Sequence, residues 1–374
     1  SQPLLADLGQ QIELPFDMHI QGIHGTNWQY QAINTKGESE FEVKVSSADL
    51  LADATGDNVQ LQTLSVTSSL GEVQAKGQIQ LQADFPLQLN INADLNALKQ
   101  KETVLLPATK ANLTLSGTLK KQTALLLQTQ GAIDAELKAE AQLTAPKTPL
   151  NVKLAVARGQ YPFDGNDPLS IKDVNLTING DILTSQIQLN GAVSGMGIPA
   201  NSLDLQAVGH LSNIEIHQLK LNALEGAAEL KGDVNWRDGV EWNSHLQLAK
   251  MNLGRYLSAF PAVLSGELSS QGQVNQKGWQ VAVPQVDIQG TLAQHSLALQ
   301  GGLTAGDQQG VTIPQLVLTY GENKIHAQGS MGKQSDFTLN IHAPNLRGLW
   351  ADLSASLVGQ IKLNGDVMRP RVDV

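Results

Sequence analysis

The stretch IQLQADFPLQLNINADL, residues 79–95, indicates the fold class of the chain. Every odd position from Ile79 to Leu95 is apolar, and every even position is polar or proline. Side chains alternate between the two faces of a β-strand, so the stretch predicts strands with one apolar and one polar face. Because Pro86 cannot donate a ladder hydrogen bond, we expect two strands that meet near Phe85 and Pro86.

The same alternation recurs along the chain. In residues 133–143, IDAELKAEAQL, the odd positions are apolar and the even positions are charged or amide residues. Shorter runs of the same kind are LNVKLAVA (150–157), VNLTI (174–178), LDLQA (203–207), LQL (246–248) and FTLNIHA (337–343). Turn signals such as DGNDP (164–168) and GMGIPAN (195–201) separate the runs. The sequence therefore predicts a mainly all-β fold.

The sequence also contains a repeat that is longer than a single strand. The triplets LSV, LKL and LVL begin at Leu64, Leu219 and Leu316, and a glycine follows each of these leucines 13 residues later. These glycines are Gly77, Gly232 and Gly329. We expect one continuous repetitive β-sheet over residues 1–374, with repeat-like units at about 59–128, 214–283 and 313–374 and no independent catalytic domain.

Two segments have helical rather than alternating spacing. NLGRYLSAF (252–260) and NLRGLWADL (345–353) place apolar residues at i, i+3, i+4 and i+7, with an asparagine where an N-cap belongs. We predict short amphipathic helices that pack over the apolar strand faces. Their packing residues would be Leu253, Tyr256, Leu257 and Phe260 in the first helix and Leu346, Leu349, Trp350 and Leu353 in the second.

The composition limits the possible partners. The chain has 374 residues, of which 41% are hydrophobic and only 4% are aromatic, and its formal net charge is -10. This charge disfavours nucleic acid as a partner, and no stretch interleaves basic and stacking aromatic residues. The absence of cysteine excludes disulfides, thiolate metal sites and a cysteine nucleophile.

No motif of catalysis or cofactor binding is present. The sequence has no phosphate-binding glycine loop, no zinc-protease motif and no nucleophile elbow. Its eight histidines are scattered without the carboxylates that would complete a metal site. We therefore expect no enzyme activity, no cofactor and no metal.

The alternation leaves open what the apolar faces contact. They could close on each other as the dry core of a structural β-solenoid, or they could contact something that is not protein. Periodicity alone favours the structural solenoid, because in most proteins an apolar stripe is core.

Two segments resemble a known family. LSGELSSQGQV (264–274) and LVGQIKLNGDVMRPRV (357–372), with the Asn-Leu helices just before them, resemble the glycine- and leucine-rich strand repeats of the TamB family. The TamB family belongs to the AsmA-like group of bacterial envelope proteins, which are relatives of the bridge-like lipid transfer proteins. The resemblance extends over the whole chain as a general pattern of glycine, leucine and polar residues. The motifs match best from about residue 214 to residue 374.

The resemblance implies a long curled β-sheet, taco-like in section, which forms an open half-barrel groove with a hydrophobic concave face. It also implies a periplasmic location in a Gram-negative bacterium, with the full-length protein anchored in the inner membrane. The implied partners are phospholipid acyl chains and the outer-membrane barrel protein TamA, which together with TamB forms the translocation and assembly module of outer-membrane biogenesis. We expect this chain to be the periplasmic middle of such a protein.

The leading hypothesis is intermembrane phospholipid transport through a continuous hydrophobic groove. Pulling a chain of about 16 carbons into water costs on the order of 12 kcal/mol, and an aliphatic groove would remove most of that cost. The expected lining residues are Ile79, Leu81, Leu87, Leu89, Ile91, Ile133, Leu137, Leu246, Leu248, Phe337, Leu339 and Ile341. The alternatives are a scaffold or chaperone that binds outer-membrane proteins by β-strand addition, and a structural β-solenoid with a dry core.

Overall fold

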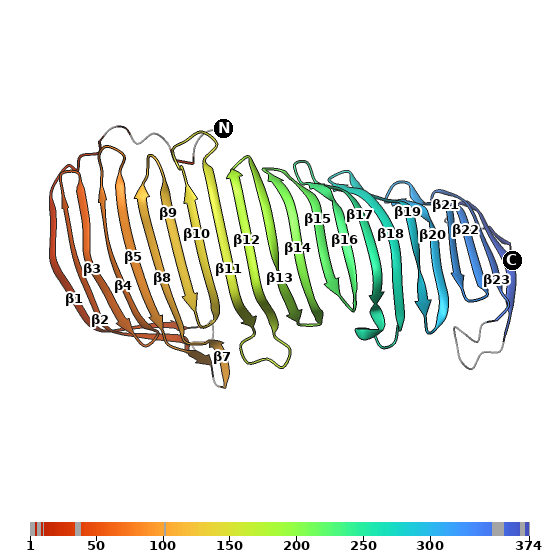
Figure 1. Cartoon of the computed structure of the whole chain (residues 1–374), viewed down its shortest axis with the longest axis horizontal. Coiled ribbons are helices and arrows are strands. Elements are labelled where there is room, and N and C mark those ends of the chain that lie inside the picture. Colours follow the sequence, from red (N-terminus) through yellow and green to blue (C-terminus); the bar gives the residue numbers. More distant parts are fainter. Residues whose placement is uncertain are drawn as a thin grey trace. The chain divides into compact units, whose positions relative to one another are not determined.

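The computed structural model describes residues 4–5, 9, 11–33, 39–100, 102–345, 355–366 and 371–373. The chain forms two compact units, residues 1–198 and residues 199–374. Each unit is built from antiparallel strands joined mostly by tight turns (Figure 1). The prediction of a mainly β fold of repeated strands is confirmed.

In unit 1 each strand pairs with the next one along the sheet, and all pairings are antiparallel. The order is β1 (Met18–Ile33), β2 (Ser39–Thr55), β3 (Asn58–Ser68), β4 (Gly71–Gln80), β5 (Pro86–Leu95), β8 (Thr109–Thr118), β9 (Thr123–Gln130), β10 (Ile133–Ala141), β11 (Pro149–Tyr161), β12 (Leu169–Asp181) and β13 (Thr184–Gly195). Between β5 and β8, the short strands β6 (Leu98–Gln100) and β7 (Thr103–Leu106) form a separate hairpin.

Unit 2 has the same construction. Its strands are β14 (Ile198–His210), β15 (Asn213–Ala223), β16 (Gly226–Asn235), β17 (Val240–Asn252), β18 (Ala262–Asn275), β19 (Gly278–Leu292), β20 (His295–Gly306), β21 (Gly310–Tyr320), β22 (Asn323–Met331), β23 (Gln334–Ala343), β24 (Leu357–Asp366) and β25 (Arg371–Asp373). A single-turn 3-10 helix, η1 (Leu253–Arg255), lies between β17 and β18.

The stretch at residues 79–95 divides as its proline predicts. Strand β4 ends at Gln80 and β5 begins at Pro86, so two strands meet beside Phe85. Leu81 was expected to line an apolar face, but it lies in the connection between the strands, where its backbone N–H donates to the carbonyl of Asp57 at 2.6 Å. The alternation at residues 81–85 therefore belongs to a turn and not to a strand.

The three-fold sequence repeat corresponds to a repeated β-bulge. Each of the three leucines pairs with the residue eleven positions later, whereas the residue three positions before each leucine pairs with the repeat glycine. The bulged pairs are Leu61–Gly77, Ile216–Gly232 and Ile313–Gly329. Bulges bend strands and increase their twist, and this bending supports the curled sheet that the resemblance implies.

The predicted helix at residues 252–260 is wrong in length. The helix covers only three residues, and the Asn252 side chain donates to Glu225 Oε2 at 2.9 Å instead of capping it. Tyr256, Leu257 and Phe260 are 48%, 51% and 39% exposed, so they do not pack over an apolar face. A segment this short has little intrinsic helix stability without a packed face.

The second predicted helix cannot be compared in the same way. Its residues Leu346, Leu349, Trp350 and Leu353 lie outside the described residues. Asn345, the expected cap, is described and exchanges two hydrogen bonds with the side chain of Asn323, at 2.8 and 3.1 Å. Among the helices of the described part of the chain, none has the length and apolar character needed to cross a membrane.

Candidate functional site

One face of the sheet in unit 1 carries aliphatic rows that run across the strands. Cross-strand pairing joins one aliphatic residue from every strand into a row. This row is Ile23, Leu50, Leu64, Ala75, Ile91, Leu113, Leu127, Leu137, Leu154, Leu176 and Leu189. A second row lies two residues away along each strand and includes Leu89, Leu115, Leu125, Val152, Ile178 and Ile187.

Unit 2 repeats the arrangement. Its first row is Leu205, Leu219, Leu230, Leu246, Leu268, Val286, Gly301, Leu316, Ala327, Leu339 and Ile361. The second is Leu203, Leu221, Ala228, Leu248, Gly266, Ile288, Leu299, Leu318, Ile325, Ile341 and Gly359. In each unit, none of the residues named in the two rows is charged, and both rows lie on the same face of the sheet.

The aliphatic face is the less exposed of the two faces, and we call it the inner face. Three residues of this face are buried: Ala75 is 5% exposed, Ala207 4% and Val156 6%. The larger members, such as Leu89 and Ile91, are only half-buried. The polar residues that alternate with them, such as Asn92, are exposed.

The chain exposes more surface than a closed core would leave. Its solvent-accessible surface is 23045 Å². Two separate compact proteins of half the 40.0 kDa mass would together expose roughly 17,400 Å². The excess shows that the sheets are less compact than globular proteins of the same mass.

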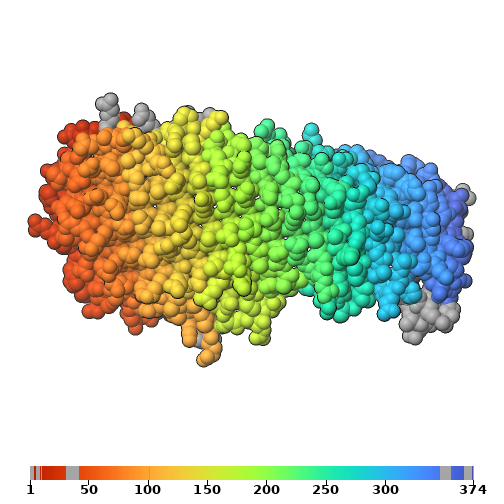
Figure 2. All heavy atoms as spheres, viewed as in Figure 1, coloured from red at the N-terminus to blue at the C-terminus, as the bar shows by residue number. Residues whose placement is uncertain are grey.

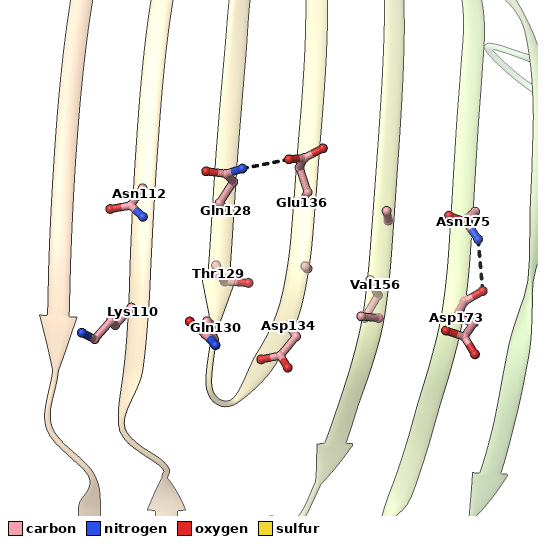
Figure 3. A pocket seen from close by; sticks show the side chains of 13 residues that line it. Lys110, Asn112, Gln128, Thr129, Gln130, Asp134, Glu136, Val156, Asp173 and Asn175 are labelled. Atoms are coloured by element: carbon pink, nitrogen blue, oxygen red, sulfur yellow. Dashed lines mark hydrogen bonds between the residues drawn. The ribbon is translucent and has the colours of Figure 1, made fainter.

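The outer face of unit 1 has a polar character. A depression of about 680 Å³ lies on it, lined by amide and charged side chains from β8 to β12 (Figure 3). Gln128 donates to Glu136 Oε2 at 2.8 Å, and Asn175 donates to the carbonyl of Asp173 at 3.2 Å. Its apolar lining is limited to Ala135, Ala155, Val156 and Ala157, so the aliphatic rows are the better candidate site for an acyl chain.

Two carboxylates of this depression, Asp134 and Glu136, do not have the raised pKa of a general acid. The backbone N–H of Gly131 and the guanidinium of Arg158 lower the pKa of Asp134. Lys138 and Gln128 lower the pKa of Glu136. A general acid at neutral pH needs a raised pKa instead. Within the part of the chain that the structure describes, no group of histidines and carboxylates could hold a metal ion.

The structure places most of the predicted lining residues on the inner faces. Ile79, Leu87, Leu89, Ile91, Ile133 and Leu137 lie on the inner face of unit 1, and Leu246, Leu248, Phe337, Leu339 and Ile341 on that of unit 2. Leu81 lies outside it, in the β4–β5 connection. Ile133 lies at the first position of β10 and is 43% exposed.

Many inner-face residues escape the sequence prediction. Leu113, Leu127 and Leu154 belong to the same row as Ile91 and Leu137. The strands of Leu113 and Leu154 show the same alternation, so their faces could have been read from the sequence, whereas Leu127 ends the apolar run Ala124–Leu127, which does not alternate. Which residues stand side by side depends on the register of strand pairing, and a single sequence does not reveal it.

A family model and a named relative both indicate the family of this chain. A family model described as "TamB, N-terminal domain" matches residues 1–374. The translocation and assembly module subunit TamB of Haemophilus influenzae is 43% identical over 366 residues, which are 97% of this chain and 28% of that protein. An uncharacterized protein of Buchnera aphidicola subsp. Schizaphis graminum is 20% identical over 300 residues, which are 78% of this chain and 28% of that protein. No solved structure matches.

The chain spans about 28% of the length of these two relatives. The matching family model is that of the N-terminal domain, so the expectation of a piece from the middle of the protein is corrected. With the family model over its whole length and 43% identity to the Haemophilus protein, the chain belongs to the TamB family.

Proposed function

We propose that the inner faces of this chain hold phospholipid acyl chains, as one part of a TamB protein that carries lipid through the periplasm between the inner and outer membranes. The observation that carries the proposal is the pair of aliphatic rows in each unit, continuous from strand to strand and only half-buried. The name of the Haemophilus relative, translocation and assembly module subunit TamB, supports membership of such a module. TamA is the proposed outer-membrane partner of the whole protein.

The energetics favour an occupant for these faces. A soluble protein seldom exposes a contiguous apolar patch above a few hundred Å². Each row spans about 50 Å, since ten strand spacings of about 4.8 Å separate the eleven paired strands. Acyl chains would cover this surface, and the surface would in turn remove most of the roughly 0.8 kcal/mol per methylene that exposing the chain to water costs.

Transport along such a face needs no chemical step. An acyl chain that moves from one aliphatic row position to the next exchanges one set of methyl contacts for another, so its free energy changes little. The rows contain few aromatic residues that would make a deep, selective pocket. We therefore expect weak selectivity among phospholipid headgroups.

The test compares added charge on the two faces of the same strands. The variant Leu89→Asp/Leu115→Asp/Leu125→Asp places three carboxylates side by side on the inner face of β5, β8 and β9. The control Asn92→Asp/Asn112→Asp/Gln128→Glu places three carboxylates side by side on the outer face of those strands. We expect the inner variant to lose bound phospholipid, measured per chain by mass spectrometry, and the outer variant to keep it. Equal phospholipid content in both folded variants would refute the proposal.

One observation favours the alternative of strand addition. Strand β1 pairs with β2 along one edge, and its residues Ile23, Trp28 and Tyr30 are 54%, 55% and 65% exposed. An edge strand with exposed large side chains is a template for a further strand. Crosslinks from Trp28 to a polypeptide, together with unchanged lipid content in the inner-face variant, would favour this function.

A further inference from the structure

The inner face of unit 2 carries a pair of hydroxyl groups beside its first aliphatic row. Ser244 on β17 and Ser270 on β18 are cross-strand partners, and they lie two residues from the row partners Leu246 and Leu268. The two strands lie side by side in the blue-green part of unit 2 (Figures 1 and 2). Residues two apart on a strand share a face, so both hydroxyls lie on the inner face, where they are half-buried.

Apolar residues and glycine continue this face on both sides of the serine pair. Gly232 on β16 pairs with Ser244, and Ile216 on β15 pairs with Gly232. On the other side, Val283 on β19 lies opposite the Ser270 position and pairs with Leu303 on β20. The two hydroxyls therefore stand inside the aliphatic surface and not in a polar region of their own.

Trp242 orients the hydroxyl of Ser270. The indole Nε1–H of Trp242 donates to Ser270 Oγ at 3.1 Å. Trp242 pairs with Gly272 across the strands, and a Cβ on Gly272 would meet the indole ring at 2.4 Å. The ring thus occupies the space that a side chain at residue 272 would need, and this position brings its N–H to the serine.

The hydroxyl of Ser244 makes a second contact at an irregular place in the sheet. It donates to the backbone carbonyl of Ser270 at 3.3 Å. Between the pairs Ser269–Gln285 and Gln271–Ala282, the single residue Ser270 stands opposite both Val283 and Pro284. Such a bulge re-aims side chains and interrupts the ladder, to which a proline cannot donate.

These contacts leave one hydrogen-bond donor on the inner face. A serine hydroxyl has one proton to donate and two lone pairs that accept. Ser244 directs its proton to the Ser270 carbonyl, whereas the Ser270 hydroxyl accepts from Trp242 and donates to no group among the residues that the structure describes. The neighbouring leucine side chains carry no acceptor, and a hydroxyl in apolar surroundings is stabilised when it finds one.

We propose that the Ser270 hydroxyl donates a hydrogen bond to the ester carbonyl of a phospholipid acyl chain on the inner face of unit 2. The inference rests on the proposed function and goes further, since it assigns a residue that recognises the acyl linkage. An acyl chain is apolar except at the ester that joins it to glycerol, and the ester carbonyl is an acceptor. The aliphatic rows would contact the methylene groups, and the hydroxyl beside them would contact the carbonyl.

The test is a competition between two lipids that differ only at this linkage. Dioleoylphosphatidylcholine and its diether analogue, which has no ester carbonyl, are supplied in equal amounts to the whole chain. A photo-crosslinking amino acid at Leu246 captures lipid beside the two serines, and one at Leu113 captures lipid on the inner face of unit 1. Mass spectrometry gives the ratio of ester adducts to ether adducts at each position.

We expect an ester preference of about threefold at residue 246, the size that one neutral hydrogen bond supplies, and no preference at residue 113. Ser270→Ala should abolish the preference at residue 246, and Ser270→Thr should keep it because the hydroxyl is retained. Ser269→Ala is the matched control. Ser269 lies on the opposite face, where its Oγ is 3.0 Å from His245 Nδ1, so its loss should leave the preference unchanged.

The outcomes separate the two proposals. If neither position yields a phospholipid adduct, the proposed function fails and this inference fails with it. Adducts at residue 113 with none at residue 246, or equal ester and ether adducts at residue 246, would overturn only the assignment to Ser270. An ester preference that survives Ser270→Ala would also overturn it, because another group would then recognise the carbonyl.

Discussion

The stability of two unit 1 variants distinguishes a closed core from an open inner face. Phe85 is 1% exposed, and Phe85→Ala should destabilise the unit by about 3–5 kcal/mol. Leu89 is half-buried on the inner face. Leu89→Ala removes three carbons, worth about 2.4 kcal/mol when fully buried and about 1.5–2.2 kcal/mol at the partial burial of Leu89. Since an open face leaves no cavity, we expect the smaller value.

Hydrogen exchange measured by mass spectrometry gives these values for unit 1 alone. Peptides from β8 and β9 report the free energy of opening of the unit without the assumption that the whole chain unfolds in one step. The lipid-free chain is used, and Gln88→Ala on the outer face of β5 is the control, expected within about 0.5 kcal/mol of the wild type.

A cost for Leu89→Ala equal to that for Phe85→Ala would refute the reasoning. It would mean that Leu89 sits in a packed core, where a leucine truncation costs about 2–5 kcal/mol because a cavity remains. The dry structural solenoid would then be the better description of the inner face.

Three further predictions concern local structure. A Cβ at Gly329 would lie 2.0 Å from the carbonyl oxygen of Asp336 in a backbone with φ 114°, so Gly329→Ala should destabilise unit 2 by at least about 1–3 kcal/mol in urea unfolding, while Gly359→Ala, with no atom within 4 Å, should not. Similar midpoints for both would contradict the bulge assignment. The backbone N–H groups of Leu183 and Thr184 lower the pKa of Asp181 from 3.8, so the stability they provide is complete above that pH and is lost as the pH falls through the lower folded-state pKa. Asp181→Asn should therefore lose less stability than the wild type below pH 3.8 in acid unfolding, and an identical acid profile would show that these bonds contribute nothing. Leu257 is 51% exposed, so Leu257→Ser should change the urea midpoint by less than the equivalent of about 0.5 kcal/mol. A loss of stability above about 1.5 kcal/mol would show that Leu257 packs against the sheet, as the predicted helix requires.

The strand faces could be predicted because their signal is local. Alternation with period two assigns Leu89 and Ile91 to one face whatever the rest of the chain does. The same rule fails at Leu81, because the alternating pattern continues through a turn in which Ala83 and Phe85 have positive φ. Nothing in the local pattern distinguishes these turn residues from strand residues.

The helix prediction for residues 252–260 was wrong in length for a different reason. An i, i+3, i+4 pattern predicts a helix only where the apolar stripe has a surface to pack on, and Leu257 points to solvent. Gly254 lies inside the segment and Pro261 follows it, and a Cβ at Gly254 would meet the Pro261 Cα at 2.9 Å. The chain turns here instead of continuing a helix.

The features that join distant segments could not be predicted from the sequence. The row that contains Ile91 and Leu113 depends on strand register, which a two-residue slip would change while every side chain keeps its face. The backbone N–H of Leu4 donates to Thr148 Oγ1, which is 144 residues away in the sequence. The donor is a backbone N–H group, so no side-chain motif marks this contact in the sequence.

The central claim is that the inner face contacts lipid instead of protein. The most direct test places a photo-crosslinking amino acid at Leu113, in the first inner row, and identifies the adduct by mass spectrometry after irradiation in cells. Asn112, the exposed neighbour on the outer face, is the matched control. The account predicts a phospholipid adduct at residue 113 and not at residue 112. Crosslinks from residue 113 only to other residues of this chain would contradict it.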